Sequence, residues 1–335
     1  MSARLSCLPG DVEDQLVLGD GLLTVERVRC AGITRPRISR LVRAGLLVRL
    51  ARGVYASRES YDDALPWEAF ALRSRAFTWA CGPSAHAAGW SAVAIRGLPA
   101  IDPPPQKPIV VMPLGSGADT NSAFGEVREV ALPPEHRTVV NGCPILTDSR
   151  VVADIARTGA RDDALVLADA ALAAGTTVEE LRDVLNVQRF WPGVPEARWV
   201  VEHADAYAES ALETLGRLTF IEYDLPVPIS NAWIELGPIR YRPDHLLDDL
   251  WLIFEGDGDI KYNERLDAAA VVRQQREREW ELRERGFEIS RYGWSNARHH
   301  RRQLAERFRA VIAERTPRPQ GCSWYRETRT YRQAA

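Results

Sequence analysis

The stretch from Arg240 to Tyr262, RYRPDHLLDDLWLIFEGDGDIKY, constrains the fold of this chain more than any other segment. Its apolar runs predict two short strands, one from Tyr241 to Leu247 and one from Leu250 to Phe254. The pair Asp248-Asp249 lies between the two runs and is typical of a tight turn. We therefore expect a β-hairpin at this point.

Acidic side chains surround the apolar runs of the predicted hairpin. Asp244 follows a proline in the first strand, and Glu255 and Asp257 close the second strand. Because successive residues of a strand alternate between its faces, Glu255 and Asp257 leave the same face of the sheet. Lys261 follows four residues after Asp257. Three carboxylates and an amine around one hairpin predict a divalent-metal site, although an ordinary acidic turn would also contain the letters GDGD.

Composition places the chain among globular proteins and leaves room for two or three domains in 335 residues. The net charge of −3 gives no global basic signal, so any nucleic-acid surface must be a local patch. The five cysteines lack zinc-ligand or redox spacing, which favours a reducing, cytoplasmic location. We find no signal sequence and no apolar run of membrane length, so we expect no membrane partner.

Residues 1–60 predict a winged helix-turn-helix. Leu22 to Val28 has helical spacing, and a glycine turn separates it from a second helix capped by Thr34. Gly45 ends that second helix, and LLVRLARGVYAS then alternates like a hairpin with Arg52 at its tip. Helix, turn, helix and hairpin in this order define the domain.

This segment is rich in arginine. From Arg27 to Arg58 it contains nine arginines and no acidic residue, a density suited to contacts with phosphate groups. We therefore predict double-stranded DNA as a partner, with the second helix entering the major groove. The alternative is an arginine-rich helix face that is merely solvated. The predicted DNA-binding residues are Arg35, Arg37, Arg40, Arg43, Arg49 and Arg52.

The same segment resembles the winged-helix domain of the AbiEi family of antitoxins. The resemblance rests on the glycine turn in AGITR and on LVRAGLLVRLARGVY, whose ending is similar to the wing of that family. AbiEi proteins are transcriptional autoregulators of type IV toxin–antitoxin systems. The resemblance therefore implies transcriptional regulation and adds a cognate toxin protein as a further partner.

Residues 61–205 predict an α+β scaffold domain, whose layout also resembles the body of an AbiEi-type antitoxin. Helices are expected from Pro66 to Cys81 and from Pro83 to Trp90, followed by short strands and three helices between residues 147 and 187. His86 lies in an alanine-rich stretch, where packing is a commoner role for histidine than catalysis. We find no nucleotide loop, metal-spaced cluster or nucleophile elbow here.

Residues 206–315 predict an α/β domain. Ser210 is expected to cap a helix that carries Glu213, and strands follow up to the hairpin. A long helix from Asp267 to Arg285, a strand from Phe287 to Tyr292 and a last helix from Trp294 to about residue 314 complete it. Residues 316–335 lack periodicity, which indicates a flexible tail whose aromatic and arginine side chains could still contact nucleic acid or a partner.

This C-terminal order resembles the PD-(D/E)XK nuclease superfamily, and most closely its very-short-patch-repair-endonuclease-like branch. That branch often carries a glutamate-any-aspartate-glycine motif, and Glu255 to Gly258 reproduces it. The resemblance implies a restriction-endonuclease-like fold, Asp244, Glu255 and Asp257 as ligands of Mg²⁺ or Mn²⁺, and Glu213 on the preceding helix. Lys261 departs from the usual lysine position, and Gln275 and Arg276 are expected near the phosphate.

Two functions follow for the whole multi-domain α/β chain. The first is a DNA-binding protein whose C-terminal domain is a metal-dependent endodeoxyribonuclease, because hard divalent ions offset the charge that develops on a cleaved phosphodiester. The alternative is a non-catalytic transcriptional regulator or antitoxin of a type IV toxin–antitoxin system. In that case the C-terminal fold would serve as a binding module, with any catalysis lost.

Overall fold

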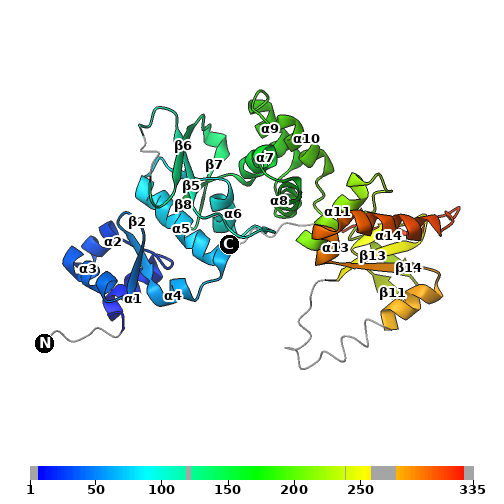
Figure 1. The fold of residues 1–335 in the computed structure, drawn as a ribbon, viewed down its shortest axis with the longest axis horizontal. Coiled ribbons are helices and arrows are strands. Elements are labelled where there is room, and N and C mark those ends of the chain that lie inside the picture. Colours follow the sequence, from blue (N-terminus) through cyan, green and yellow to red (C-terminus); the bar gives the residue numbers. More distant parts are fainter. Residues whose placement is uncertain (1–6, 118–121, 238, 258–276, 328–335) are drawn as a thin grey trace. The chain divides into compact units, whose positions relative to one another are not determined.

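The computed structural model describes residues 7–117, 122–237, 239–257 and 277–327 (Figure 1). The chain divides into two compact units. The first comprises residues up to 158 together with 179–197, and the second comprises 159–178 together with residues from 198 onward. Each unit is described by itself. The boundaries predicted at residues 60, 205 and 315 stay predictions.

The first unit begins with the elements of a winged helix. The three strands form one antiparallel sheet in the order β1–β3–β2. Part of the stretch predicted as helical, Leu22 to Val28, is instead a short strand, because Thr24 ends it and caps the next helix by accepting the Arg27 N–H. The elements are α1 (Gly10–Leu18), β1 (Leu23–Thr24), α2 (Val25–Cys30), α3 (Arg35–Arg43), β2 (Leu47–Ala51) and β3 (Val54–Ser57).

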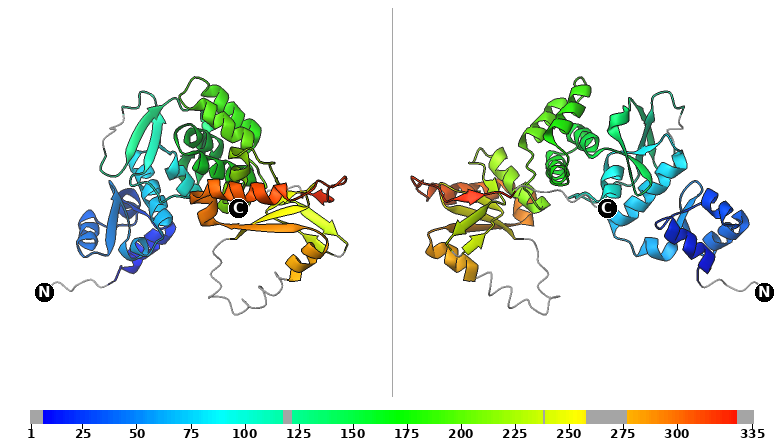
Figure 2. Two further views of the ribbon diagram at one scale, coloured as in Figure 1. Left: turned by 45° about the vertical axis from the view of Figure 1, so that its right-hand side comes forward. Right: turned by 180° about the vertical axis from the view of Figure 1, so that it is seen from behind.

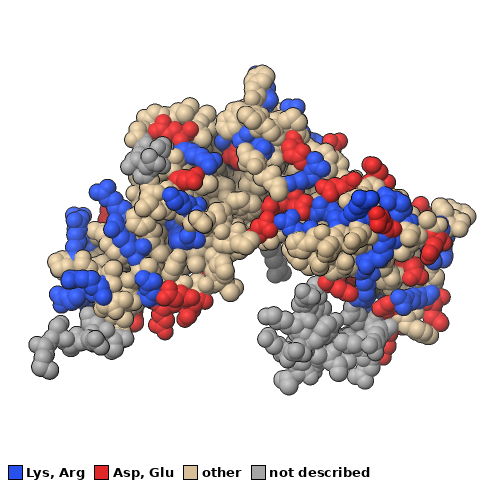
Figure 3. Space-filling model, viewed as in Figure 1, with Lys and Arg blue, Asp and Glu red and all other residues tan. Residues whose placement is uncertain are grey.

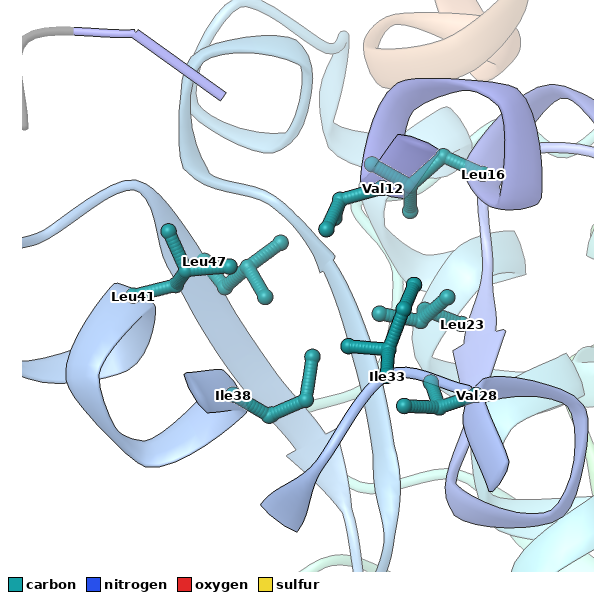
Figure 4. Packing of buried hydrophobic residues seen from close by; sticks show 8 residues of the cluster. All are labelled: Val12, Leu16, Leu23, Val28, Ile33, Ile38, Leu41 and Leu47. Carbon is teal, nitrogen blue, oxygen red and sulfur yellow. The ribbon is translucent and has the colours of Figure 1, made fainter. Parts of the chain in front are cut away.

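A compact apolar core holds these elements together (Figure 4). Ile38 and Leu41 are the inward residues of α3, and both are buried. Burial of each such side chain contributes about 1.5–3 kcal/mol, so the spacing of these two residues decides which face of α3 remains exposed. Gly45 follows α3 with φ +78°, a left-handed conformation that favours glycine and ends the helix as predicted. The core residues are Val12, Leu16, Leu23, Val28, Ile33, Ile38, Leu41 and Leu47.

The rest of the first unit contains a five-stranded sheet in the order β6–β5–β4–β8–β7. The predicted helix from Pro66 to Cys81 is present as α5 and packs against β2 and β3. The elements are α4 (Arg58–Asp62), α5 (Pro66–Cys81), β4 (His86–Ala87), α6 (Trp90–Arg96), β5 (Ile109–Pro113), β6 (Glu126–Val130), η1 (Pro134–His136), β7 (Arg137–Val140), β8 (Cys143–Leu146), α7 (Asp148–Thr158) and α9 (Val178–Val187).

The predicted helix from Pro83 to Trp90 was wrong. His86 pairs with Val111 in the sheet, and Gly89 has φ +51° immediately before α6 begins. Pairing with a strand far along the chain therefore overrides the local helical preference of the alanine-rich sequence. His86 is buried, with Nδ1 hydrogen-bonded to the Ser84 carbonyl, as expected of a packed histidine.

The second unit is built on a sheet in the order β14–β13–β12–β9, and a smaller sheet has the order β11–β10–β15. β13 runs antiparallel to β12 and parallel to β14, and the connection between β13 and β14 includes helical residues 277–284. The elements are α8 (Arg161–Ala173), α10 (Val194–His203, divided between the units), α11 (Ala211–Glu222), β9 (Ile229–Ser230), β10 (Trp233–Leu236), β11 (Ile239–Tyr241), β12 (His245–Leu247), β13 (Leu252–Asp257), β14 (Glu288–Gly293), α13 (Trp294–His299), α14 (Arg301–Ala313) and β15 (Trp324–Tyr325).

Helices α11 and α14 pack on the larger sheet (Figure 2). Phe220 of α11, Phe254 of β13 and Phe308 of α14 are buried and contact one another with ring centroids 4.6–4.9 Å apart. Aromatic pairs at this separation add about 0.5–1.5 kcal/mol to the burial of their surface. This cluster secures the end of β13 that carries the acidic residues.

Three details of the second unit differ from expectation. The predicted strand from Tyr241 to Leu247 is two strands in different sheets, because Pro243 has no N–H for a ladder. The last helix is divided between α13 and α14, since His300 leaves the helical conformation at φ −128°. Within the segment expected to be a flexible tail, β15 pairs with β10 and Cys322 is buried. These residues show no sequence periodicity, but the strand pairing and the burial of Cys322 give them a defined structure.

Candidate functional site

The outer face of α3 presents arginine side chains to solvent. Arg35, Arg40 and Arg43 are exposed, and so is Arg52 at the tip of the β2–β3 hairpin. Within the described ranges, Arg35, Arg40 and Arg52 form no ion pair with an acidic side chain. Figure 3 shows basic side chains gathered over α2 and α3. This surface therefore has positive charge that the described acidic side chains leave unpaired at Arg35, Arg40 and Arg52.

Two of the arginines predicted to bind DNA have partners within the protein. Arg37 donates to both carboxylate oxygens of Asp11 in α1, at 2.6 and 2.7 Å, and this hydrogen bonding lowers the pKa of Asp11. Arg49 lies 5.3 Å from the ring centroid of Phe124, and its Nε donates to the Ala51 carbonyl. These two side chains connect parts of the first unit.

In the second unit, Asp244 and Glu255 form a pair of partly buried carboxyl groups. The Gly256 N–H donates to Asp244 Oδ2 at 2.7 Å, and the Tyr241 hydroxyl donates to Glu255 Oε1 at 2.8 Å. Burial, and after it the charge of Asp244, raises the pKa of Glu255 to about 8. Burial also raises the pKa of Asp244, with a second contribution from Glu213. Like charges in a poorly solvated place repel, so a cation would stabilise the ionised pair.

Glu213 is buried in α11 and is fully engaged by protein donors. Ser210 Oγ donates to its Oε1 at 2.8 Å, and the Glu209 N–H donates to Oε2 at 2.8 Å. Asn231 Nδ2 also donates to Oε2, at 2.6 Å. Ser210 Oγ in turn accepts the Glu213 N–H, which confirms the predicted cap of α11. Glu213 therefore acts on the site through its charge and through the start of α11.

Asp257 is the third predicted carboxylate, and its partner is Arg291 of β14. Arg291 Nη1 lies 2.6 Å from Asp257 Oδ1, and Nη2 lies 3.4 Å from Glu279 Oε2. Sequence reasoning missed Arg291 because no motif contains it. The signal for it is tertiary: β13 and β14 pair in parallel with Glu255 opposite Arg291.

A buried layer supports the pair of carboxyl groups from beneath. The Tyr292 hydroxyl and His245 Nε2 are hydrogen-bonded at 2.9 Å, and burial lowers the pKa of His245 to about 3, so its ring is neutral. The Tyr292 hydroxyl occupies the space beside Gly216, where a methyl group would collide with it. A methyl group at Gly256 would meet Leu212 Cγ at 3.0 Å. Both glycines therefore permit close packing under the site.

The predicted metal site stays a prediction. Lys261, Gln275 and Arg276 lie outside them. Among the residues that the structure does describe, no three or more His, Cys, Asp or Glu side chains are placed to hold one metal ion. Mg²⁺ characteristically binds one or two protein carboxylates and keeps several waters. Asp244 and Glu255 are the side chains that fit this pattern.

A comparison with protein families matches part of the first unit. Residues 13–58 match a family model described as "Transcriptional regulator, AbiEi antitoxin". This match covers the winged helix and supports assignment of that part to DNA-binding regulators. No curated protein matches the chain.

One solved structure is similar over part of the chain. It is the crystal structure of the RV2827C protein from Mycobacterium tuberculosis, 18% identical, with 59% of this chain and 79% of that chain covered at a TM-score of 0.35. At this score the similarity carries no argument. Separately, the described helices include none that is long and apolar enough to cross a membrane.

Proposed function

We propose that this protein is a transcriptional regulator that binds duplex DNA through its winged helix. The observation that carries the proposal is the two-sided character of α3. Ile38 and Leu41 lie in the apolar core, while Arg35 and Arg40 are exposed and have no acidic partner among the described residues. A helix of this kind fits the major groove, and Arg52 at the wing tip would contact a neighbouring phosphate.

The family match extends this proposal to an antitoxin of a type IV system. Such a protein would repress its own gene and act in the cytoplasm with a cognate toxin protein as partner. The five cysteines are free thiols, in keeping with a reducing compartment. Gene context, namely a toxin gene adjacent to this one, would support the extension.

A matched pair of variants tests DNA binding. Fluorescence anisotropy would measure the affinity of the full chain for a duplex taken from the region upstream of its own gene. We expect Arg40→Ala to weaken binding, because it removes a phosphate contact. Arg37→Ala on the same helix should weaken it less, because Arg37 is held by Asp11. Equal, unchanged affinities for both variants and for Arg35→Ala would contradict the proposal.

A second candidate function is metal-dependent cleavage of a phosphodiester bond in the second unit. The specific observation in its favour is the partly buried pair Asp244 and Glu255, whose charges repel without a cation. A bound Mg²⁺ would offset phosphate charge and lower the pKa of a coordinated water. Hydrogen bonds within the chain would orient the two ligands. The Gly256 N–H donates to Asp244, and the Tyr241 hydroxyl donates to Glu255.

Cleavage is tested on supercoiled plasmid DNA with Mg²⁺ or Mn²⁺. If the second unit is a nuclease, the wild type nicks the plasmid, and both Asp244→Asn and Glu255→Gln remove the activity. These variants should keep the duplex affinity of the wild type, because the winged helix is unchanged. Tight binding without nicking by the wild type would leave the regulator as the function and refute the nuclease.

A further inference from the structure

Arg291 lies within the acidic site of the second unit and was not foreseen there. It is opposite Glu255 in the parallel pair of β13 and β14. Paired residues of neighbouring strands project from the same face of a sheet, and Asp257 lies on that face too, two residues after Glu255. Arg291 therefore stands beside Glu255 and reaches Asp257 at 2.6 Å.

Two acidic side chains hold the guanidinium of Arg291 in place. Asp257 contacts Nη1, and Glu279 of the helical residues 277–284 contacts Nη2. The side chain is 29% exposed, so the ion pairs are partly shielded from water. Arginine remains charged at all accessible pH values and donates in a rigid, planar arrangement. The positive charge at this point of the site is thus permanent.

We propose that Asp257 is the anchor of Arg291 rather than a metal ligand, so that, among the residues the structure describes, Asp244 and Glu255 would hold a divalent cation. Arg291 then supplies guanidinium donors and a positive charge for the phosphate. This inference rests on the proposed metal-dependent function. It is supported by the absence, in the described part of the chain, of any three potential ligands that converge on one metal position.

The direct test is Mn²⁺ binding to the full chain, measured by isothermal titration calorimetry and by the electron paramagnetic resonance signal of the free ion. We expect one Mn²⁺ per chain. Asp244→Asn and Glu255→Gln should each weaken binding at least about tenfold, as loss of a supporting or ligating group does at metal sites. Thermal melting would verify that each variant is folded.

The decisive variant combines Asp257→Asn with Arg291→Gln, so that both charged side chains of the ion pair become neutral. Because net charge is unchanged, the double variant should bind Mn²⁺ like the wild type. Arg291→Gln alone should bind Mn²⁺ more tightly, since a positive charge is lost and Asp257 is released. Arg291→Lys, which preserves the charge, should restore the wild-type affinity.

The outcomes distinguish failure of the metal-dependent function from failure of the roles proposed for Asp257 and Arg291. If the wild type binds Mn²⁺ and the double variant loses as much affinity as Asp244→Asn, then Asp257 is a ligand and the inference is overturned. If Arg291→Gln weakens Mn²⁺ binding, the inference is overturned as well. If the wild type binds no Mn²⁺, the metal-dependent function itself fails, and the inference fails with it.

Discussion

The charged side chains of the winged helix and those of the acidic site differ in their exposure to solvent. In α3 the charged groups lie on the surface of a helix whose other face is buried in the apolar core, and Arg35 and Arg40 form no ion pair with a described acidic side chain. In the second unit Glu213 is buried, Asp244 and Glu255 are partly buried, and all three accept hydrogen bonds from donors on several distant segments. Exposed charges can thus be removed to test function alone, whereas removal of buried charges also tests stability.

Two ion pairs make this contrast measurable. Arg37 and Asp11 are 38% and 48% exposed, whereas Arg217 and Asp169 are 5% and 2% exposed. Both pairs join helices, α3 to α1 in the first case and α11 to α8 in the second. Desolvation makes the buried pair sensitive to loss of one partner, while solvent screens the exposed pair.

We expect the largest effect on stability from Asp169→Ala. It leaves Arg217 buried without its carboxylate and removes acceptors from Thr214 and from the Asp205 N–H. Breaking a buried pair in this way costs about 3–5 kcal/mol of unfolding free energy. Urea unfolding of the second unit would measure the loss. Glu284→Ala, at an exposed position, serves as control, and an equally small loss in both variants would refute the contrast.

A smaller loss is expected from Gly216→Ala. The added methyl group collides with the Tyr292 hydroxyl, and overpacking of this kind costs about 1–3 kcal/mol. Alanine favours the interior of α11 by up to about 1 kcal/mol over glycine, so the net loss lies toward the lower part of that range. Gly10→Ala, where the space is open, is the control. A Gly216→Ala protein as stable as the control would show that Tyr292 is placed elsewhere.

A buried histidine makes the stability of the first unit depend on pH. Arg150 Nη1 donates to His136 Nδ1, and burial, then the charge of Arg150, lowers the pKa of His136, although Glu135 and Asp154 oppose this. The neutral ring is favoured in the folded state. The neutral His136 ring therefore contributes fully to the free energy of unfolding above the unfolded pKa of about 6.5. This contribution is lost as the pH falls below that value.

Urea unfolding between pH 7.5 and pH 5 would test this sign. Wild-type stability should fall with pH more steeply than that of His136→Gln, which retains an acceptor for Arg150 but does not titrate. Other groups titrate in both proteins, so the difference between the two slopes is the result that matters. Identical slopes would show that His136 does not contribute.

The smallest effect is expected from Asp11→Asn. The Arg37–Asp11 pair is largely solvated, and exposed pairs contribute about 0–1 kcal/mol. Thermal melting should therefore show a small shift compared with that of Asp169→Ala. A loss similar in size to the Asp169→Ala loss would mean that the α1–α3 contact depends on this pair rather than on the apolar core.

The two regions also differ in how far they could be predicted. The winged helix is encoded locally: the inward spacing of Ile38 and Leu41, the turn at Gly45 and the hairpin around Arg52 all lie within a short segment. The internal partners of Arg37 and Arg49 could not be foreseen, because Asp11 and Phe124 lie on other elements.

In the second unit the acidic residues were found by their pattern, but their roles depend on pairing across the chain. Arg291 enters the site only because β14 lies parallel to β13. Tyr241 reaches Glu255 only because Pro243 separates β11 from β12. Alternation along one strand correctly placed Glu255 and Asp257 on one face. The alternation could not show that Asp257 forms an ion pair with Arg291 of the neighbouring strand β14.

The salt dependence of duplex binding tests the central claim most directly. For the wild type, the logarithm of the association constant should fall linearly with the logarithm of salt concentration. Each lost phosphate contact lowers the slope by about 0.9, so the triple variant Arg35→Ala, Arg40→Ala, Arg52→Ala should lose up to about 2.7 of it, together with much of its affinity. Its melting temperature should match the wild type, because these side chains are exposed. A triple variant with the wild-type affinity and slope would contradict DNA binding through the winged helix.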